Sequence, residues 1–472
     1  MLRRALVAFV ALPGLVAFVV PLFLAWLGGW SGSFRWIAVV PLVAGALLLS
    51  WSVRDFYVAG KGTLAPWSPP QRLVSSGAYR MSRNPMYVAV SLALFGWAVG
   101  FRSMVLLLYA MAVTIAFHLR VVYREEIWLA RTHREAWTRY AARVPRWMFP
   151  NRRALVTSVL ALIVALPVAG LIYEALADAA GARAFPPPGM LVDIGGRRLH
   201  LLCIGEGEPS VVFEASGWGS ALSSSGARER IANRTTVCSY DRRGKGWSDA
   251  APGAATAGTL AQDLAVLQDR AGLRPPLVIV TASIGGLTTE MFARQYPERV
   301  AGLVFVDAAS SLSLPLLAAR SRTVAAAACT AGALAHVGVI RLLDPFGLGG
   351  DTDEGRRGAA LTYNARSWGH TCAMARGLTA SVREFQEAPP LRADLPLTVL
   401  SASSAVDLVP PGLQKVVDVE TVRRASVEAH QRLARTSTRG TWALVPDSTH
   451  LIGSSRPDAV ADAVLDMLEQ IR

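Results

Sequence analysis

Long apolar segments near the start of the chain limit the folds that this sequence can adopt. They run from Ala5 to Leu27, from Trp36 to Val53, from Met86 to Leu119 and from Ala154 to Leu176. A helix of about 20 apolar residues crosses the hydrocarbon core of a bilayer. The third segment is too long for one crossing, so we predict a hairpin of two short helices that turns near residues 100–103. The N-terminal part is therefore expected to be an all-α transmembrane bundle of about five spans.

The arginines of this part predict how the spans are oriented. Arg3 and Arg4 precede the first span, and most other arginines of this part lie in the loops 54–85 and 120–153. Cytoplasmic loops of membrane proteins collect positive charge, so the N-terminus and both loops should face the cytoplasm. After an odd number of spans, the chain beyond Leu176 is expected outside. This predicts a multi-pass protein of a bacterial plasma membrane with an exoplasmic C-terminal domain; a single span at 86–119 would reverse the orientation.

The net charge of +14 does not predict binding of nucleic acids. The only lysines are Lys61, Lys245 and Lys415, and many of the arginines lie between apolar segments. The C-terminal half has no basic stripe with interleaved aromatic residues, which nucleic-acid-binding domains often carry. The bilayer is the partner that the charge pattern indicates.

A second domain is expected after a Pro-rich linker. The predicted organisation is residues 1–153 for a first transmembrane domain, 154–176 for a last transmembrane helix, 177–188 for the linker and 189–472 for the second domain. In that domain short β-rich runs alternate with helical stretches, the pattern of an α/β fold with a mostly parallel sheet. An Ala-rich stretch at about 311–390 breaks the alternation and predicts a helical cap insertion.

The strands of this sheet can be located from the β-rich runs. A hairpin within residues 192–203 should turn at Gly195 and Gly196. Further strands are predicted at 210–214, 235–240, 277–281, 300–306, 397–401 and 441–445.

The strongest catalytic motif is a serine between a strand and a helix. Val278-Ile-Val-Thr-Ala-Ser283-Ile-Gly-Gly286 is an apolar strand followed by a serine and small residues that open a helix. A nucleophile elbow needs this context, because small neighbours let the serine project above the sheet. Ser283 and Gly285 match G-x-S-x-G, whereas Thr281 replaces the first glycine. We predict Ser283 as the nucleophile; the alternative is a serine that only caps the helix.

The order of residues along the chain predicts a base and two candidate acids. Enzymes with this elbow place nucleophile, acid and base in that order, and His450 follows the last predicted strand. Asp407 follows the penultimate strand, which is the usual place of the acid, and is favoured. Asp307 follows the strand before it and stays as the alternative, because an aspartate there can also merely cap a turn.

The loop after an early strand predicts an oxyanion hole. It is formed by Phe213-Glu-Ala-Ser-Gly217-Trp218-Gly219, and the backbone N–H groups of Trp218 and Ile284 would donate to the developing oxyanion. The expected reaction is hydrolysis of a small-molecule or lipid ester through an acyl-enzyme. No cysteine or histidine spacing suits zinc, so no metal and no hydrolase cofactor are expected.

Residues from about 189 to 472 resemble the α/β-hydrolase superfamily. Tyr240-Asp-Arg-Arg-Gly-Lys-Gly-Trp-Ser248 is similar to that family's Y-D-x-R-G-x-G-x-S stretch, and Tyr296-Pro-Glu-Arg-Val300 also fits. The resemblance implies a serine esterase or acyl hydrolase. It also implies neighbouring strands for Cys203 and Cys238, and hence a disulfide. All four cysteines lie in this half, where an even number fits disulfides of an oxidising compartment; four buried free thiols are the alternative.

Residues from about 53 to 150 resemble the isoprenylcysteine carboxyl methyltransferase and phospholipid methyltransferase families. The similar motifs are Gly77-Ala-Tyr-Arg-Met-Ser-Arg-Asn-Pro-Met-Tyr87 and Glu125-Glu126-Ile-Trp-Leu129. The resemblance implies an S-adenosylmethionine site at the cytoplasmic face. Its residues would be Gly77, Tyr79, Arg83, Asn84, Pro85, Tyr87, Glu125 and Glu126. Asn84 stands where many relatives have histidine, which leaves the methyl acceptor open.

Three functions fit these motifs. The first is a bifunctional membrane protein that joins a methyltransferase to a serine hydrolase. The second is a hydrolase whose membrane half is only an anchor. The third is a binding module that keeps the α/β-hydrolase fold without catalysis.

Overall fold

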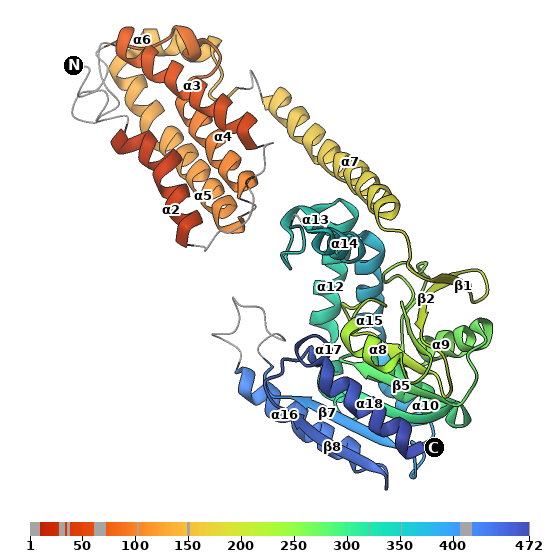
Figure 1. The fold of residues 1–472 in the computed structure, drawn as a ribbon. Helices are drawn as coiled ribbons and strands as arrows, with labels where there is room; N and C mark the ends of the chain where they lie inside the picture. Colours follow the sequence, from red (N-terminus) through yellow and green to blue (C-terminus); the bar gives the residue numbers. More distant parts are fainter. Residues whose placement is uncertain are drawn as a thin grey trace. The chain divides into compact units, whose positions relative to one another are not determined.

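The chain folds into two compact units, Met1–Val168 and Ala169–Arg472. A computed structural model describes residues 10–27, 34, 38–60, 72–101, 103–148, 152–319, 321–350, 352–405 and 418–471. Within these ranges the first unit is helical and the second combines a sheet with helices (Figure 1). Both predicted fold types are therefore present.

The N-terminal unit is built mostly from apolar helices, two of which pack closely at a glycine. Its elements are η1 (Val10–Val19), α2 (Val20–Leu27), α3 (Val39–Val58), η3 (Gly77–Arg80), α4 (Pro85–Gly100), α5 (Met104–Arg120), η4 (Val121–Glu125), α6 (Glu126–Arg143) and the first part of α7 (Arg152–Ala184). A Cβ added at Gly45 of α3 would lie 2.8 Å from the carbonyl oxygen of Ala89 in α4. Glycine thus allows these two backbones to approach closely, as is common between helices in membranes.

Three helices among the described residues are long and apolar enough to cross a membrane. They are Val39–Val58, Val105–Arg143 and Val164–Ala184, and two shorter apolar helices are Pro13–Ala25 and Pro85–Gly100. The predicted helical hairpin is observed, since α4 ends and α5 begins on either side of residues 101–103. Ser103 caps α5 by accepting a hydrogen bond from the N–H of Leu106 at 3.3 Å. The prediction of about five spans is supported only roughly, because two of the five helices are short.

An eight-stranded sheet forms the centre of the C-terminal unit. Its strands are β1 (Met190–Asp193), β2 (Arg198–Ile204), β3 (Val211–Glu214), β4 (Val237–Tyr240), β5 (Leu277–Ala282), β6 (Val300–Val306), β7 (Leu397–Ala402) and β8 (Gly440–Val445). Their order is β1-β2-β4-β3-β5-β6-β7-β8. β2 pairs antiparallel with β1 and β4, and all other pairs are parallel. Every predicted strand is present, and the hairpin turns at Gly195 and Gly196, both with positive φ.

Helices cover both faces of the sheet (Figure 1). They are α8 (Ser225–Ile231), α9 (Ala257–Ala271), α10 (Gly285–Gln295), α16 (Val419–Ala434), α17 (Ile452–Ser455) and α18 (Pro457–Ile471), with the short η5 (Pro297–Arg299) before β6. One core cluster joins the sheet to α9, α10 and α16. A second cluster joins the other face to α8 and α18. The alternating apolar runs of the sequence thus produce three layers.

The cap insertion consists of five helices between β6 and β7. They are α11 (Leu314–Ala319), α12 (Ser321–His336), α13 (Val339–Leu343), α14 (Asp353–Thr362) and α15 (Ala365–Glu387). A disulfide between Cys329 and Cys372 joins α12 to α15. The implied disulfide between Cys203 and Cys238 is also present and joins β2 to β4.

The last apolar helix continues into the predicted linker. α7 ends at Ala184, whereas the linker was expected from residue 177. The segment 175–184 is rich in alanine, the residue with the highest helix propensity, so the helix persists beyond its apolar part. The three prolines that follow lack the N–H groups a helix needs, and they form the connection to β1.

The Cys203–Cys238 bridge generates a stability prediction. The Cys203→Ala/Cys238→Ala variant should lose about 2–4 kcal/mol of unfolding free energy, because the bridge restricts the unfolded chain. Thermal unfolding of the detergent-purified chain, followed by circular dichroism, measures this change. An unchanged midpoint, together with alkylation of Cys203 in the unreduced wild type, would contradict it.

Candidate functional site

Ser283 lies in a tight turn between β5 and α10. Its backbone φ is 53°, a conformation that serine adopts only under constraint. The Ser283 carbonyl accepts hydrogen bonds from the N–H groups of Gly286 (3.1 Å) and Ala309 (2.8 Å). A Cβ at position 286 would lie 2.0 Å from the carbonyl oxygen of Ala309, so only glycine allows this turn. The strand–turn–helix arrangement expected around Ser283 is therefore observed.

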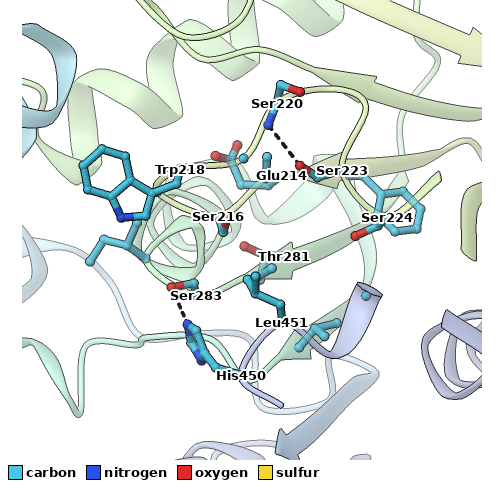
Figure 2. Close-up of a pocket in the computed structure, with 18 of the residues that line it drawn as sticks. Glu214, Ser216, Trp218, Ser220, Ser223, Ser224, Thr281, Ser283, His450 and Leu451 are labelled. Carbon is cyan, nitrogen blue, oxygen red and sulfur yellow. Dashed lines mark hydrogen bonds between the residues drawn. The ribbon is translucent and has the colours of Figure 1, made fainter. Parts of the chain in front are cut away.

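His450 joins Ser283 to a carboxylate. Its Nε2 atom lies 2.9 Å from Ser283 Oγ, and its Nδ1 atom lies 2.6 Å from Asp307 Oδ2. Figure 2 shows the first of these contacts. His450 comes from the loop between β8 and α17, and Asp307 follows β6. The His450 and Asp307 side chains are only 12% and 7% exposed, so these hydrogen bonds are largely shielded from water and strengthened.

Asp307 is held from a second side. Its Oδ1 atom accepts a hydrogen bond from the N–H of Ala402 at 3.0 Å and lies 3.7 Å from Nδ1 of His430. Burial lowers the pKa of His430, which favours the neutral imidazole. Asp307, the alternative of the two predicted acids, contacts His450. Asp407 lies outside the described residues.

A cavity of about 550 Å³ opens beside Ser283 (Figure 2). Trp218 and Ile284, the predicted oxyanion-hole residues, both line it. A Cβ added at Gly217 would lie 3.1 Å from Cγ2 of Ile284, so this loop lies directly against the turn that carries Ser283. The cap supplies an apolar wall formed by Leu317, Val324, Ala328, Met374 and Leu378.

A buried Glu214–Arg242 pair supports the predicted oxyanion loop, and neither residue was predicted as part of the site. Arg242 donates to Glu214 Oε1 at 2.6 Å and to the carbonyl oxygens of Ala215 (3.0 Å) and Ser216 (2.6 Å). The Tyr240 hydroxyl also donates to Glu214. Desolvation raises the pKa of Glu214 to about 7, although the charge of Arg242 opposes this shift. The pair thus fixes the backbone just before Trp218.

Lys245 packs behind the same loop. Its Nζ atom donates to Ser367 Oγ and Thr371 Oγ1, both at 3.0 Å, and lies 4.9 Å from the ring centroid of Trp218. Burial, together with the charge of the nearby Arg242, lowers the pKa of Lys245 to about 7. Arg242 and Lys245 occupy variable positions of the Y-D-x-R-G-x-G-x-S stretch, so the motif did not single them out.

The N-terminal unit contains a second cavity of about 930 Å³. Of the eight residues expected near a cofactor, five line this cavity: Tyr79, Arg83, Asn84, Tyr87 and Glu125. Glu125 Oε1 accepts hydrogen bonds from the Tyr87 hydroxyl (2.5 Å) and from Nε of Arg120 (2.7 Å). Residues from the two separate sequence motifs therefore meet at one cavity.

The other three predicted residues support the wall of this cavity. Glu126 accepts hydrogen bonds from Arg83 (2.9 Å) and from two nitrogens of Arg146 (2.6 and 2.9 Å). Pro85 is the first residue of α4, a position where its missing N–H costs nothing. Gly77 has a φ of +59°, and a Cβ there would lie 2.0 Å from Asp55 Oδ2.

The lining suits the groups of S-adenosylmethionine. Nε of Arg83 is buried and has no hydrogen-bond partner among the described residues, so a ligand acceptor would satisfy it. Glu125 offers a carboxylate for hydroxyl or ammonium groups, and aromatic side chains from Tyr79 and Trp128 also face the cavity. A volume of this size is typical of small-molecule sites. The residues present thus fit the implied cofactor.

Two family models match the chain in separate regions. The phospholipid methyltransferase model matches residues 34–136, and the α/β-hydrolase fold model matches residues 201–326. The first match includes most of the residues that line the cavity of the N-terminal unit, and the second includes Ser283 and Asp307.

Individual relatives share shorter or more distant similarity. The probable transporter efuK of Hormonema carpetanum is 32% identical over 138 residues, which cover 28% of this chain and 20% of that protein. The uncharacterized protein YbdG of Bacillus subtilis is 23% identical over 158 residues, which cover 33% of this chain and 48% of that protein. The chain thus spans less than half the length of both relatives.

Among solved structures, a thermophilic esterase from Thermogutta terrifontis aligns with 22% identity and a TM-score of 0.43. The alignment covers 60% of this chain and 97% of the esterase chain. The two family matches show that the chain joins a segment similar to phospholipid methyltransferases to a segment similar to α/β-hydrolases.

Proposed function

We propose that the C-terminal unit is a serine hydrolase that cleaves carboxylic esters through an acyl-enzyme on Ser283. The observation that carries this proposal is the hydrogen-bonded chain from Ser283 Oγ through His450 to Asp307. A serine at a strained elbow, an imidazole and a buried carboxylate are the parts that nucleophilic acyl transfer requires. A serine that only capped a helix would need no such partners.

In the proposed first step, Ser283 Oγ attacks the carbonyl carbon of the ester while its proton moves to Nε2 of His450. Asp307 accepts the hydrogen bond from Nδ1 and stabilises the imidazolium that forms. The N–H groups of Trp218 and Ile284 donate to the oxyanion of the tetrahedral intermediate. The intermediate collapses, the C–O bond to the alcohol breaks, and the alcohol leaves with the proton from Nε2.

In the second step, water hydrolyses the acyl-enzyme. His450 takes a proton from the water, whose oxygen attacks the acyl carbon, and the proton then returns to Ser283 Oγ as the acid leaves. The carboxylate in this scheme is Asp307 rather than the favoured Asp407, because Asp307 contacts His450 directly. The acid thus follows β6, the strand next to the one that carries the nucleophile.

For the N-terminal unit we propose methyl transfer from S-adenosylmethionine, which would supply an electrophilic methyl group. Glu125 would bind its ribose hydroxyls or amino group, and Arg83 would bind an acceptor such as its carboxylate. The convergence of both sequence motifs on one cavity supports this reading over a purely anchoring role.

We further propose that the chain is a multi-pass protein of a bacterial plasma membrane with an exoplasmic hydrolase. The arginine-rich loops favour this orientation. The two disulfides also favour it, since such bridges persist in oxidising compartments.

The nucleophile prediction is tested with a soluble chromogenic ester. The Ser283→Ala variant should hydrolyse p-nitrophenyl acetate at least about a thousandfold more slowly than the detergent-purified wild type, because it loses the hydroxyl that is hydrogen-bonded to Nε2 of His450. Ser426→Ala, on α16, is the matched control and should keep wild-type activity. A folded wild type that is inactive and takes no fluorophosphonate would favour the binding-module reading.

The choice of acid is tested with two isosteric variants. Asp307→Asn should lower kcat by about three to four orders of magnitude, because an amide favours the wrong imidazole tautomer. Asp407→Asn should leave kcat within about twofold of the wild type. The reverse pattern of activities would reassign the acid to Asp407.

The cofactor site is tested by binding rather than by turnover. Glu125→Gln should weaken S-adenosylmethionine binding by about tenfold or more in isothermal titration calorimetry, since a charge-assisted hydrogen bond is lost. Glu135→Gln, at an exposed position of α6, is the control. A wild type that binds no S-adenosylmethionine would support the reading in which this half is only an anchor.

A further inference from the structure

The cap of the hydrolase packs directly on α7. A Cβ added at Gly170 would lie 2.4 Å from the carbonyl oxygen of Val337, so glycine allows the two backbones to touch. One turn farther along α7, Glu174 accepts hydrogen bonds from Nη2 (2.9 Å) and Nε (3.0 Å) of Arg341 in α13. Both side chains of this pair are almost fully buried. The cap is therefore fixed to α7 at a defined position along the helix axis.

The position of these contacts coincides with the end of the apolar part of α7. Between Arg153 and Glu174 the sequence of α7 has no charged residue, a run of about 20 residues that matches the thickness of a hydrocarbon core. The candidate span Val164–Ala184 overlaps this run, but its second half carries Glu174, Asp178 and Arg183, so the uncharged run is the part expected in the core. Gly170 and Tyr173 lie in the last turn of this run. Tyr173 contacts the cap, since a Cβ at Gly338 would lie 2.5 Å from its ring. The α13 end of the cap thus meets α7 where the helix would leave the bilayer.

The cap also becomes more polar along α7 in the direction from Gly170 to Gly181. α13, which contacts α7 at Glu174, carries exposed Leu342 and Leu343. α14 approaches α7 at Gly181, about 16 Å beyond Gly170 along the helix axis. α14 exposes charged side chains instead: Asp353, Glu354, Arg356 and Arg357. The apolar end of the cap therefore contacts the end of the uncharged run of α7, and the polar helix contacts the part of α7 beyond it.

Apolar side chains connect this end of the cap with residues that line the cavity of Ser283. Phe346 follows α13, is 47% exposed, and lies 5.3 Å from the ring of Trp218. Trp218 is itself 46% exposed and lines the cavity, as do the exposed Leu317 and Val324. Large exposed apolar groups cost little when a bilayer covers them, and contiguous patches of them mark interaction sites.

We propose that the α13 end of the cap, formed by Leu334, Leu342, Leu343 and Phe346, is seated in the lipid bilayer, and that Ser283 cleaves esters whose acyl chain enters from the membrane. The substrate class rests on the proposed function; the seating of the cap does not. A bilayer is favoured over a second copy of the chain as the occupant, because α7 brings this surface to the membrane boundary. The carboxylate of Asp344 is compatible with this position, since it accepts hydrogen bonds from the Tyr363 hydroxyl (2.6 Å) and the N–H of Gly349 (3.0 Å).

The seating is tested on the full chain in phosphatidylcholine nanodiscs without reference to catalysis. A nitroxide on Leu343→Cys should be more accessible to oxygen, which dissolves in lipid, than to a water-soluble nickel chelate. The same label on Leu444→Cys, an exposed apolar position of β8, should show the opposite preference. Equal preferences at the two positions would overturn the proposal. If the nitroxide spectrum instead broadens as the number of chains per disc increases, the surface would be assigned to contact with a second copy of the chain.

The substrate class is tested by comparing two esters in the same discs. Leu342→Glu/Leu343→Glu should lower the ratio of p-nitrophenyl palmitate to p-nitrophenyl acetate hydrolysis by at least about tenfold, because charge opposes insertion into lipid. Leu444→Glu should leave this ratio unchanged. An unchanged ratio in the double variant would overturn entry from the membrane. Failure of the wild type on both esters would overturn the proposed function, while the nitroxide measurement would still decide the seating.

Discussion

The parallel register of β5 to β8 is the constraint on which the candidate hydrolase site depends. Parallel strands bring their carboxyl ends to one edge of the sheet, and ligands of such folds bind there. Ser283 follows β5, Asp307 follows β6 and His450 follows β8. β7 separates the last two strands and supplies the N–H of Ala402, which fixes the carboxylate of Asp307. A slip of register in any of these pairs would separate groups that come from positions far apart in the sequence.

The sequence located the strands, the cap insertion and the Ser283–His450 pair because each of these leaves a local signal. Apolar runs between turn residues predict strands, and a serine before small residues predicts an elbow. The choice between Asp307 and Asp407 could not be made in this way, since both follow strands of the same sheet. Contact between Asp307 and His450 depends on how far each loop reaches from its strand. No motif records that distance.

The supporting charges were missed for a related reason. Glu214, Arg242 and Lys245 act through contacts with other segments, and two of them stand at variable positions of a family motif. In the N-terminal unit the motifs did predict a common location, and five of the eight residues line one cavity. The structural roles of Gly77 and Glu126 depend on their contacts with Asp55 and Arg146, which lie outside the two motifs. A motif identifies such residues without distinguishing those that face the cavity from those that hold its wall.

The Cys329–Cys372 bridge has a consequence for the width of the cavity beside Ser283. Ala328 and Thr371, the residues next to the two cysteines, both line the cavity of Ser283. α12 and α15, the helices that carry them, are thus cross-linked at the level of the cavity and cannot spread apart there. The width of this part of the cavity is therefore restricted by a covalent bond as well as by side-chain packing. In the proposed hydrolase, this bridge would limit how wide a group the cavity can admit, and it would do so only where both cysteines are oxidised.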